Sequence, residues 1–286
     1  MAIIYDKLLN LEIPSIEQSY GEKDVLLYAL GVGLGADPID PEQLAFVYER
    51  HLKVLPTFAV VLGHPGFWER DLDTGIDHVK VVHGEQGLKL HRPLPPHGTV
   101  IGRSRVSGIV DKGSGRGALV YSERVITDKA TAERLATVTQ TTFCRADGGF
   151  GGPTGPAPEP HLLPGRTPDL VCDLPTIPQA ALIYRLSADM NPLHADPDMA
   201  AQAGYPRPIL HGLATYGVAC HAVLKSLCRY DPERLGSFDC RFTAPVYPGE
   251  TFRTEIWLDG TIASFRTRSL DRDVVAISNG RAELTG

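Results

Sequence analysis

The chain has 286 residues, of which 43% are hydrophobic and 22% are charged, so it can bury a core in one large domain or in two of about 140 residues. Its formal net charge of −6 gives no general attraction to nucleic acid or to an anionic membrane. Its longest apolar runs are far shorter than the roughly 20 residues of a membrane span. We therefore expect neither nucleic acid nor a membrane as a partner.

The chain ends and the cysteines favour a reduced, cytoplasmic protein. The N-terminal segment carries acidic residues early and has no basic leader, and the final Leu284-Thr285-Gly286 is not the peroxisomal address. The five cysteines are an odd number and form no Cys-x-x-Cys pair. Neither a disulfide framework nor a zinc site is expected.

The first half of the chain is predicted to form a short helix followed by strands. Asp40-Pro41 predicts a helix start, because Asp is a favoured N-cap and Pro suits the first helical position. A Pro-rich turn at 91–99 leads into β-branched and alternating residues. We expect strands at 100–110, 117–127 and 135–144.

A connector rich in glycine and proline follows at 146–169. This composition favours an extended, solvated segment over a packed element. It predicts a first half at 1–145 and a second half at 170–286.

The second half repeats the same order of elements. Asp196-Pro197 predicts another short helix, and the apolar stretch at 211–229 predicts a long, nearly buried helix. Strands are expected at 251–258, 262–269 and 274–283.

A constant register of 156 residues relates the two halves. Tyr28-Ala-Leu30 and Tyr184-Arg-Leu186 are each followed, twelve residues after the tyrosine, by Asp-Pro. We predict an α+β fold in which each half has a long helix wrapped by an antiparallel sheet. The halves would be related by a pseudo-twofold axis, with their sheets paired edge to edge.

Three polar residues near Pro192 form the strongest candidate site. Asp189, Asn191 and His194 lie within six residues, and Pro192 prevents a regular helix there, so the segment turns and the carboxylate and imidazole can converge. Such a pair can hold a water, deprotonate it and return a proton to carbon, with Asn191 orienting the water or the pair. For a lone Asp and His, a helix cap and a packing residue would be the commoner explanation.

The repeat favours the chemical explanation. A residue that the fold needs should occur in both halves, yet the polar trio occurs in one only. At the offset of 156, the counterparts are Gly33 for Asp189, Gly35 for Asn191 and Pro38 for His194.

Gly212 is a candidate donor to a developing negative charge. His211-Gly212 begins the predicted long helix, where free amides and the helix dipole favour an anion, and glycine permits close approach. With a thioester substrate, the Gly212 N–H would stabilise the enolate formed when water adds at the β-carbon. Relief of crowding at the helix start would explain the glycine equally well.

Residues 184–197 and the later Pro208-Ile-Leu-His-Gly-Leu213 resemble the motif of the hydratase 2, or MaoC-like, family. The first half is similar to the non-catalytic repeat of that family. Its matching segments are 28–33, 83–86, 92–95 and 111–115. The sequence departs from the motif at Ala188, where the family usually has glycine.

The resemblance implies a double hot-dog fold, with a first half that accommodates the acyl chain. It implies reversible syn hydration of trans-2-enoyl-CoA to (R)-3-hydroxyacyl-CoA, with coenzyme A as part of the substrate and no metal or redox cofactor. It assigns Asp189 and His194 as the catalytic pair, Asn191 as their support and Gly212 as the oxyanion donor.

The same resemblance implies a set of contacts to the acyl-CoA. A cation near the phosphates is physically sensible because the ligand is a polyanion; Lys112 takes this role, and Arg241 is a weaker candidate. The residues expected to contact substrate are His83, Gly84, Lys112, Met190, Pro192, Leu193 and Phe242.

Alternative functions stay open at this point. A MaoC-like dehydratase would run the reaction in reverse on a specialised acyl chain, and a hot-dog thioesterase would hydrolyse the thioester. A non-enzymatic acyl-CoA-binding module is disfavoured because the second half keeps its polar trio. We expect a homodimer. The sequence indicates neither the length of the acyl chain nor the physiological direction of the reaction.

Overall fold

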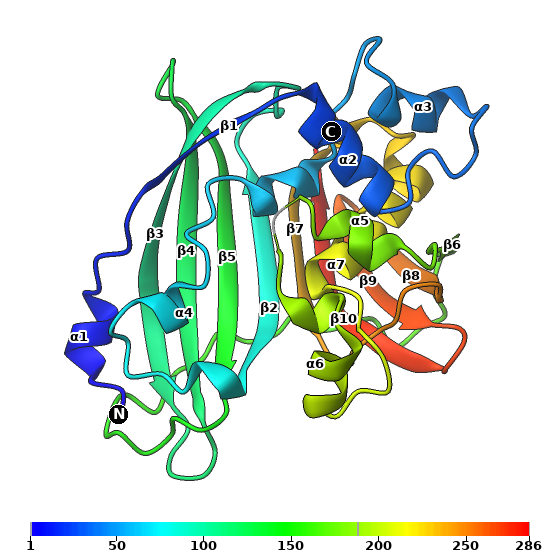
Figure 1. Ribbon diagram of the computed structural model, residues 1–286. Helices are drawn as coiled ribbons and strands as arrows, with labels where there is room; N and C mark the ends of the chain where they lie inside the picture. The colour runs from blue at the N-terminus through cyan, green and yellow to red at the C-terminus, as the bar shows by residue number, and fades with distance from the viewer. Residues whose placement is uncertain (1, 188, 286) are drawn as a thin grey trace.

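The computed structural model describes residues 2–187 and 189–285, which form one ten-stranded antiparallel sheet with helices on one side (Figure 1). The strand order is β1-β3-β4-β5-β2-β7-β10-β9-β8-β6. The strands are β1 (Ile16–Tyr20), β2 (Val81–Leu90), β3 (Gly98–Asp111), β4 (Ala118–Asp128), β5 (Arg134–Cys144), β6 (Leu170–Pro175), β7 (Leu235–Phe242), β8 (Thr251–Asp259), β9 (Ile262–Ser269) and β10 (Val274–Leu284).

The helices are mostly short. The α-helices are α1 (Tyr5–Leu9), α2 (Glu22–Gly31), α3 (Pro41–Val47), α4 (Trp68–Asp71), α5 (Ala180–Tyr184), α6 (Pro197–Gln202) and α7 (Gly212–Val223). Further short helical segments are η1 (Pro56–Val61), η2 (His78–Lys80), η3 (Pro192–His194), η4 (Leu224–Cys228) and η5 (Pro232–Arg234). Each helix within the described ranges is too short or too polar to cross a membrane.

The two halves meet where β2 pairs with β7. This seam is antiparallel and runs from Glu85 opposite Arg241 to Lys89 opposite Ser237. Five strands lie on each side of it, so the edges that each half would expose are joined into one sheet. The edge-to-edge pairing and the double hot-dog architecture expected from the sequence are confirmed.

Helix α7 is the central helix of the second half. It is buried along nearly its whole length and packs on β6, β7, β8 and β10. A π-helical turn, η4, extends it to Cys228, and Arg229 ends it in the left-handed conformation. The long buried helix predicted at 211–229 is therefore present.

The first half departs from the expectation of a long helix. The segment that packs against β2, β5 and α7 is η1, a six-residue 3₁₀ helix. Pro56 begins it, the β-branched Val60 and Val61 disfavour helix propagation, and Gly63 ends it at φ +57°. The two halves each contribute a five-stranded sheet, but they differ in the helix that the sheet wraps.

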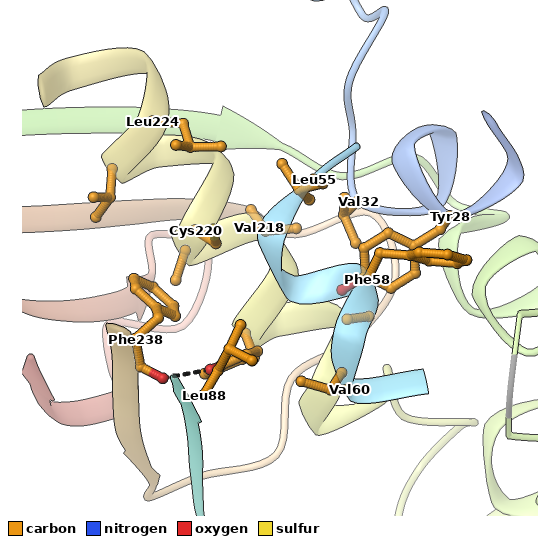
Figure 2. Packing of buried hydrophobic residues seen from close by; sticks show 14 of the residues in the cluster. Tyr28, Val32, Leu55, Phe58, Val60, Leu88, Val218, Cys220, Leu224 and Phe238 are labelled. Atoms are coloured by element: carbon orange, nitrogen blue, oxygen red, sulfur yellow. Dashed lines mark hydrogen bonds between the residues drawn. The ribbon is translucent and has the colours of Figure 1, made fainter. Parts of the chain in front are cut away.

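One hydrophobic core joins the halves across this contact. Figure 2 shows Phe58 of η1 beside Tyr28 and Val32, with Val218 and Cys220 of α7 close by. The Tyr28 and Phe58 rings lie edge to face at 5.4 Å, and the Tyr28 hydroxyl donates to the Thr57 carbonyl at 3.0 Å. Helix α7 therefore packs on residues of both halves.

The glycine- and proline-rich connector contains no helix or strand, and most of its residues are exposed. Its beginning is nevertheless anchored. The buried carboxylate of Asp111, at the end of β3, accepts hydrogen bonds from the amides of Gly113, Gly149 and Gly151 at 2.7–2.9 Å. These bonds hold the connector against the turn that carries Lys112.

Candidate active site

A cavity of about 670 Å³ lies at the junction of the two halves. Strand β2 and the ends of β4 and β5 form one wall, the start of α7 and the loop before η3 form another, and Ala157 and Pro158 of the connector complete it. Nine of the expected site residues line this cavity. They are His83, Gly84, Lys112, Asp189, Asn191, Leu193, His194, Gly212 and Phe242.

Two expected contacts are absent from the cavity wall. Met190 and Pro192 alternate with Asp189, Asn191 and Leu193 along the loop, and the described lining includes only the latter three. Met190 is 59% exposed to solvent. Contact of Met190 and Pro192 with the acyl-CoA stays a prediction. Ala188 lies outside the described residues.

Short local hydrogen bonds shape the loop that carries the polar trio. The Asn191 amide donates to Asp189 Oδ1 at 2.9 Å, and the Leu193 amide donates to Asn191 Oδ1 at 3.0 Å. Asn191 has extended backbone, as the following Pro192 requires, and caps the 3₁₀ turn η3 that ends at His194. Asn191 therefore connects the two ends of the trio.

The side chains of Asp189 and His194 converge on one point. His194 Nε2 lies 3.8 Å from Asp189 Oδ2, which is too long for a direct hydrogen bond but suits two groups that share a small polar molecule. The His194 side chain is 10% exposed and that of Asp189 is 47% exposed. The pair is thus a buried imidazole beside an accessible carboxylate.

The bond on the other ring nitrogen fixes the tautomer of His194. Its Nδ1 lies 2.9 Å from the carbonyl oxygen of Ile209, which only accepts, so Nδ1 carries the proton in the neutral ring. Burial lowers the pKa of His194 below the ordinary value, although the Ile209 carbonyl and the Asp189 carboxylate act in the opposite direction. His194 can therefore present a free Nε2 lone pair toward Asp189 at neutral pH.

Gly212 is the first residue of α7 and lines the same cavity. Amides in the first turn of a helix have no partner within the helix, and the dipole there favours negative charge. A Cβ on Gly212 would lie 3.5 Å from the Phe242 ring, an ordinary contact. The fold could therefore hold a methyl group here, so close packing alone does not require this glycine.

His83 and Phe242 form a wall of the cavity from the two seam strands. The centroids of the two rings lie 4.8 Å apart, and the rings pack edge to face. His83 Nε2 is buried and has no hydrogen-bond partner among the described residues, and burial lowers the pKa of His83 to about 4. A buried polar atom that faces a cavity without a partner is suited to bind a ligand.

The basic residues of the cavity differ in their partners. Lys112 lies over the Phe143 ring, with Nζ 5.0 Å from its centroid, next to the anchored carboxylate of Asp111. Arg241 instead forms a two-nitrogen ion pair with Glu85 across the seam, at 2.6 and 3.0 Å. Its charge is already balanced, which weakens it as a phosphate ligand.

Sequence reasoning missed Arg145 and gave His211 no side-chain role. Arg145 lines the cavity directly after β5, and its position beyond a predicted strand end was the available signal. His211 is 1% exposed and stacks on His194, with ring centroids 3.7 Å apart and planes inclined by 27°. Its neighbours come from distant parts of the sequence, so no local pattern indicated them.

Potential metal-binding atoms also meet here. Atoms of Asp189, His194 and His211 lie within 4.8 Å of one another. The two imidazoles are stacked, however, so their ring lone pairs lie in two planes inclined by only 27°, a poor arrangement for the tetrahedral coordination of one ion. The arrangement suits acid–base chemistry better than metal coordination.

Comparison with known families matches each half separately. Residues 18–146 match the family described as MFE-2 hydratase 2 N-terminal domain, and residues 161–280 match the MaoC like domain. The two matches do not overlap, and the interval between them, 147–160, lies within the connector.

Curated and solved proteins resemble the chain along nearly its whole length. The enoyl-CoA hydratase ChsH3 of Mycobacterium tuberculosis is 39% identical, over 96% of this chain and 97% of that protein. The peroxisomal enoyl-CoA hydratase 2 of Arabidopsis thaliana is 36% identical, over 98% and 95%. The crystal structure of a MaoC-like dehydratase from Phytophthora capsici superposes with a TM-score of 0.86 at 32% identity and covers 98% of both chains.

Proposed function

Because the chain belongs to the MaoC-like hydratase 2 family, we propose that its Asp189–His194 pair hydrates trans-2-enoyl-CoA to (R)-3-hydroxyacyl-CoA. The protein is an enzyme of the hydratase and dehydratase class that interconverts enoyl-CoA and 3-hydroxyacyl-CoA. The roles of individual residues and the (R) configuration are our proposals. The observation that carries the residue roles is the convergence of Asp189 Oδ2 and His194 Nε2 at 3.8 Å in the cavity that Gly212 lines.

In the hydration direction, a water is held between Asp189 and His194. The pair takes a proton from the water while its oxygen bonds to the β-carbon of the enoyl group. The electron pair of the double bond moves to the thioester oxygen, and the Gly212 N–H stabilises the resulting enolate. A proton from the pair then reaches the α-carbon on the same face, so the elements of one water are added.

The remaining residues position the substrate in this proposal. Asn191 holds the loop between the two catalytic side chains through its bond to the Leu193 amide. His83, Gly84, Leu193 and Phe242 contact the acyl-pantetheine portion, and Lys112 contacts the phosphates. We assign 170–286 as the catalytic half, 146–169 as the linker and 1–145 as the half that accommodates the acyl chain.

No cofactor is needed for this reaction as we propose it. Addition of water to an enoyl thioester involves no net oxidation or reduction, and a positioned acid–base pair with an oxyanion donor provides the required groups. We also propose a homodimer in the cytoplasm. Sedimentation of the purified protein and fractionation of its native cells test these two points.

An assay with two readouts tests the function. The protein is mixed with crotonyl-CoA and with a medium-chain enoyl-CoA, and the conjugated enoyl absorbance is followed together with free thiol. We expect absorbance to fall without thiol release, and chiral analysis of the product to give the (R) isomer. Thiol release without hydration would instead support the thioesterase alternative.

The reverse reaction on a specialised acyl chain remains the second candidate. The 3-hydroxyacyl-thioester dehydratase Y of Mycobacterium tuberculosis is 42% identical to this chain over 258 residues. This similarity supports the dehydration direction as a second candidate. Starting the same assay from 3-hydroxyacyl-CoA esters of different length and branching measures the preference.

A further inference from the structure

We propose that His211 is a positioning residue that fixes Asp189 and His194 relative to each other. This inference rests on the proposed function, in which these two residues carry the chemistry. Its evidence lies in the contacts of one buried ring with the catalytic loop and with the start of α7.

The first contact is to the backbone of Asp189. His211 Nε2 lies 3.1 Å from the Asp189 carbonyl oxygen, and the two residues are 22 positions apart in the sequence. A carbonyl only accepts, so Nε2 is the protonated nitrogen of His211. This bond fixes the backbone from which the catalytic carboxylate projects.

The second contact is to the face of His194. The stack at 3.7 Å restricts rotation of the His194 ring out of its plane, while the bond from Nδ1 to the Ile209 carbonyl fixes its direction within the plane. The His211 ring also contacts the Tyr184 ring, with the two ring centroids 5.0 Å apart. Both aromatic contacts are buried, so the ring has little freedom to move.

The remaining nitrogen indicates that His211 itself stays neutral. Its Nδ1 is buried and has no hydrogen-bond partner among the described residues, so a second proton would be unsatisfied there. Burial and the neighbouring His194 lower the pKa of His211. A neutral ring can support His194 without adding charge repulsion when His194 takes a proton.

The backbone of His211 adds a third connection. It is the N-cap of α7, so the residue directly after it is the proposed oxyanion donor, Gly212. One residue thus relates the carboxylate, the imidazole and the helix start. Misplacement of reacting groups by about 1 Å can cost on the order of 100-fold in rate, so loss of this residue should lower kcat.

Three substitutions separate the two contacts. His211→Gln keeps an N–H donor without the ring, His211→Phe keeps the stacking face without the donor, and His211→Ala removes both. We expect kcat for crotonyl-CoA to fall furthest in His211→Ala, on the order of 100-fold, and less in the other two. KM should change much less than kcat, because the residues proposed to contact the acyl-pantetheine portion are unchanged.

A buried histidine on the same helix provides the matched control. His221 also bonds a carbonyl and a tyrosine, those of Val32 and Tyr230, but does not line the cavity. His221→Phe should lower the melting temperature and leave kcat of the folded enzyme close to that of the wild type. An equal loss of kcat in His221→Phe and His211→Phe would show a general packing effect and overturn the proposal.

A double substitution tests whether His211 acts through Asp189. In an Asp189→Asn background, His211→Phe should lower the residual rate much less than it does in the wild type. A fully additive loss would contradict the proposal, as would a wild-type kcat in His211→Ala. His211→Gln and His211→Phe enzymes that are both as active as the wild type would show that neither contact positions the pair and would also overturn the proposal. Wild-type protein that fails to hydrate enoyl-CoA would refute the proposed function instead.

Discussion

At the residue scale, the candidate site is organised by backbone carbonyls. The Ile209 carbonyl fixes the tautomer of His194, and the Asp189 carbonyl receives the bond from His211. The Asp189 carboxylate is left accessible, with 47% of its side chain exposed. The atoms to which we assign the chemistry are therefore not held by these bonds, while backbone atoms and the other ring nitrogen hold the geometry.

Asp189→Asn and His194→Ala should each lower kcat by about 100-fold or more, because each removes one positioned acid–base group. Asparagine keeps an oxygen that can accept the bond from the Asn191 amide, so the loop should retain its shape. Steady-state kinetics and circular dichroism measure the rate and the fold. A fully active, correctly folded Asp189→Asn enzyme would exclude the assigned role.

Lys112→Ala should raise KM for an enoyl-CoA and leave KM for the matching enoyl-pantetheine thioester nearly unchanged. The reason is that only the coenzyme A ester carries the phosphates that the ammonium group would bind. Lys129, which pairs with Glu17 and does not line the cavity, provides the control substitution Lys129→Ala. A rise in KM with both substrates would place Lys112 elsewhere along the ligand.

At the element scale, α7 depends on close approach to the first half. A Cβ on Gly217 would lie 2.5 Å from Val32 Cγ1 and 3.2 Å from the Tyr28 hydroxyl. The small residue thus lets the central helix of one half pack on residues of the other. Gly217 also occurs in a helix interior, where glycine normally costs about 0.5–1 kcal/mol relative to alanine.

Gly217→Val should destabilise the protein by about 1–3 kcal/mol, because overpacking displaces Val32 or Tyr28. Urea denaturation monitored by fluorescence and circular dichroism measures the change. Gly165→Val is the control, because a Cβ at Gly165 would have no atom within 4 Å and the residue lies in no helix or strand. Equal stability of Gly217→Val and the wild type would contradict the packing argument.

Strand prediction succeeded where residues alternate and failed at the seam. Predicted strands 262–269 and 135–144 match β9 and β5 to within one residue, because β-branched and apolar residues alternate there. Strand β2 contains Gly84 and Gly87 and has no such alternation, so it was not predicted. Its pairing with β7 depends on contacts more than 140 residues away in the chain, which no local pattern reports.

The site was predictable to the extent that local chemistry defines it. Pro192 and the comparison with Gly33 and Pro38 identified the loop of Asp189 and His194, and the structure brings both side chains into one cavity. The role of His211 depends on a ring that meets a carbonyl 22 residues earlier. Such a contact is created by the folding of α7 against the loop.

At the scale of the whole molecule, buried histidines outnumber buried neutral carboxyl groups. Burial lowers the pKa of His83 and His221 to about 4 and also lowers the pKa of His194 and His211. In the opposite sense, burial raises the pKa of three carboxyl groups among the described residues: to about 7 for Glu69, to about 6 for Asp239, and in direction only for Asp147.

The free energy of unfolding should therefore rise as pH increases from about 4.5 to 6.5. In this window the unfolded chain protonates its histidines while the folded chain keeps them neutral, so the unfolded state binds more protons. The three carboxyl groups oppose this trend but are fewer than the seven described histidines whose pKa burial lowers. Urea denaturation at pH 5 and pH 6.5 measures the difference, and His221→Phe should reduce it. Greater stability at pH 5 would contradict this balance.

The absence of the polar trio from the first half, together with its short η1 helix, has an evolutionary consequence. After duplication of an ancestral hot-dog unit, one copy could retain the bond-making groups while selection on the other copy was relaxed. Mutations in that copy can alter the shape of the shared wall without abolishing water addition. Descendants of such an enzyme can acquire new acyl substrates by gradual drift in one half, with the reaction itself inherited unchanged.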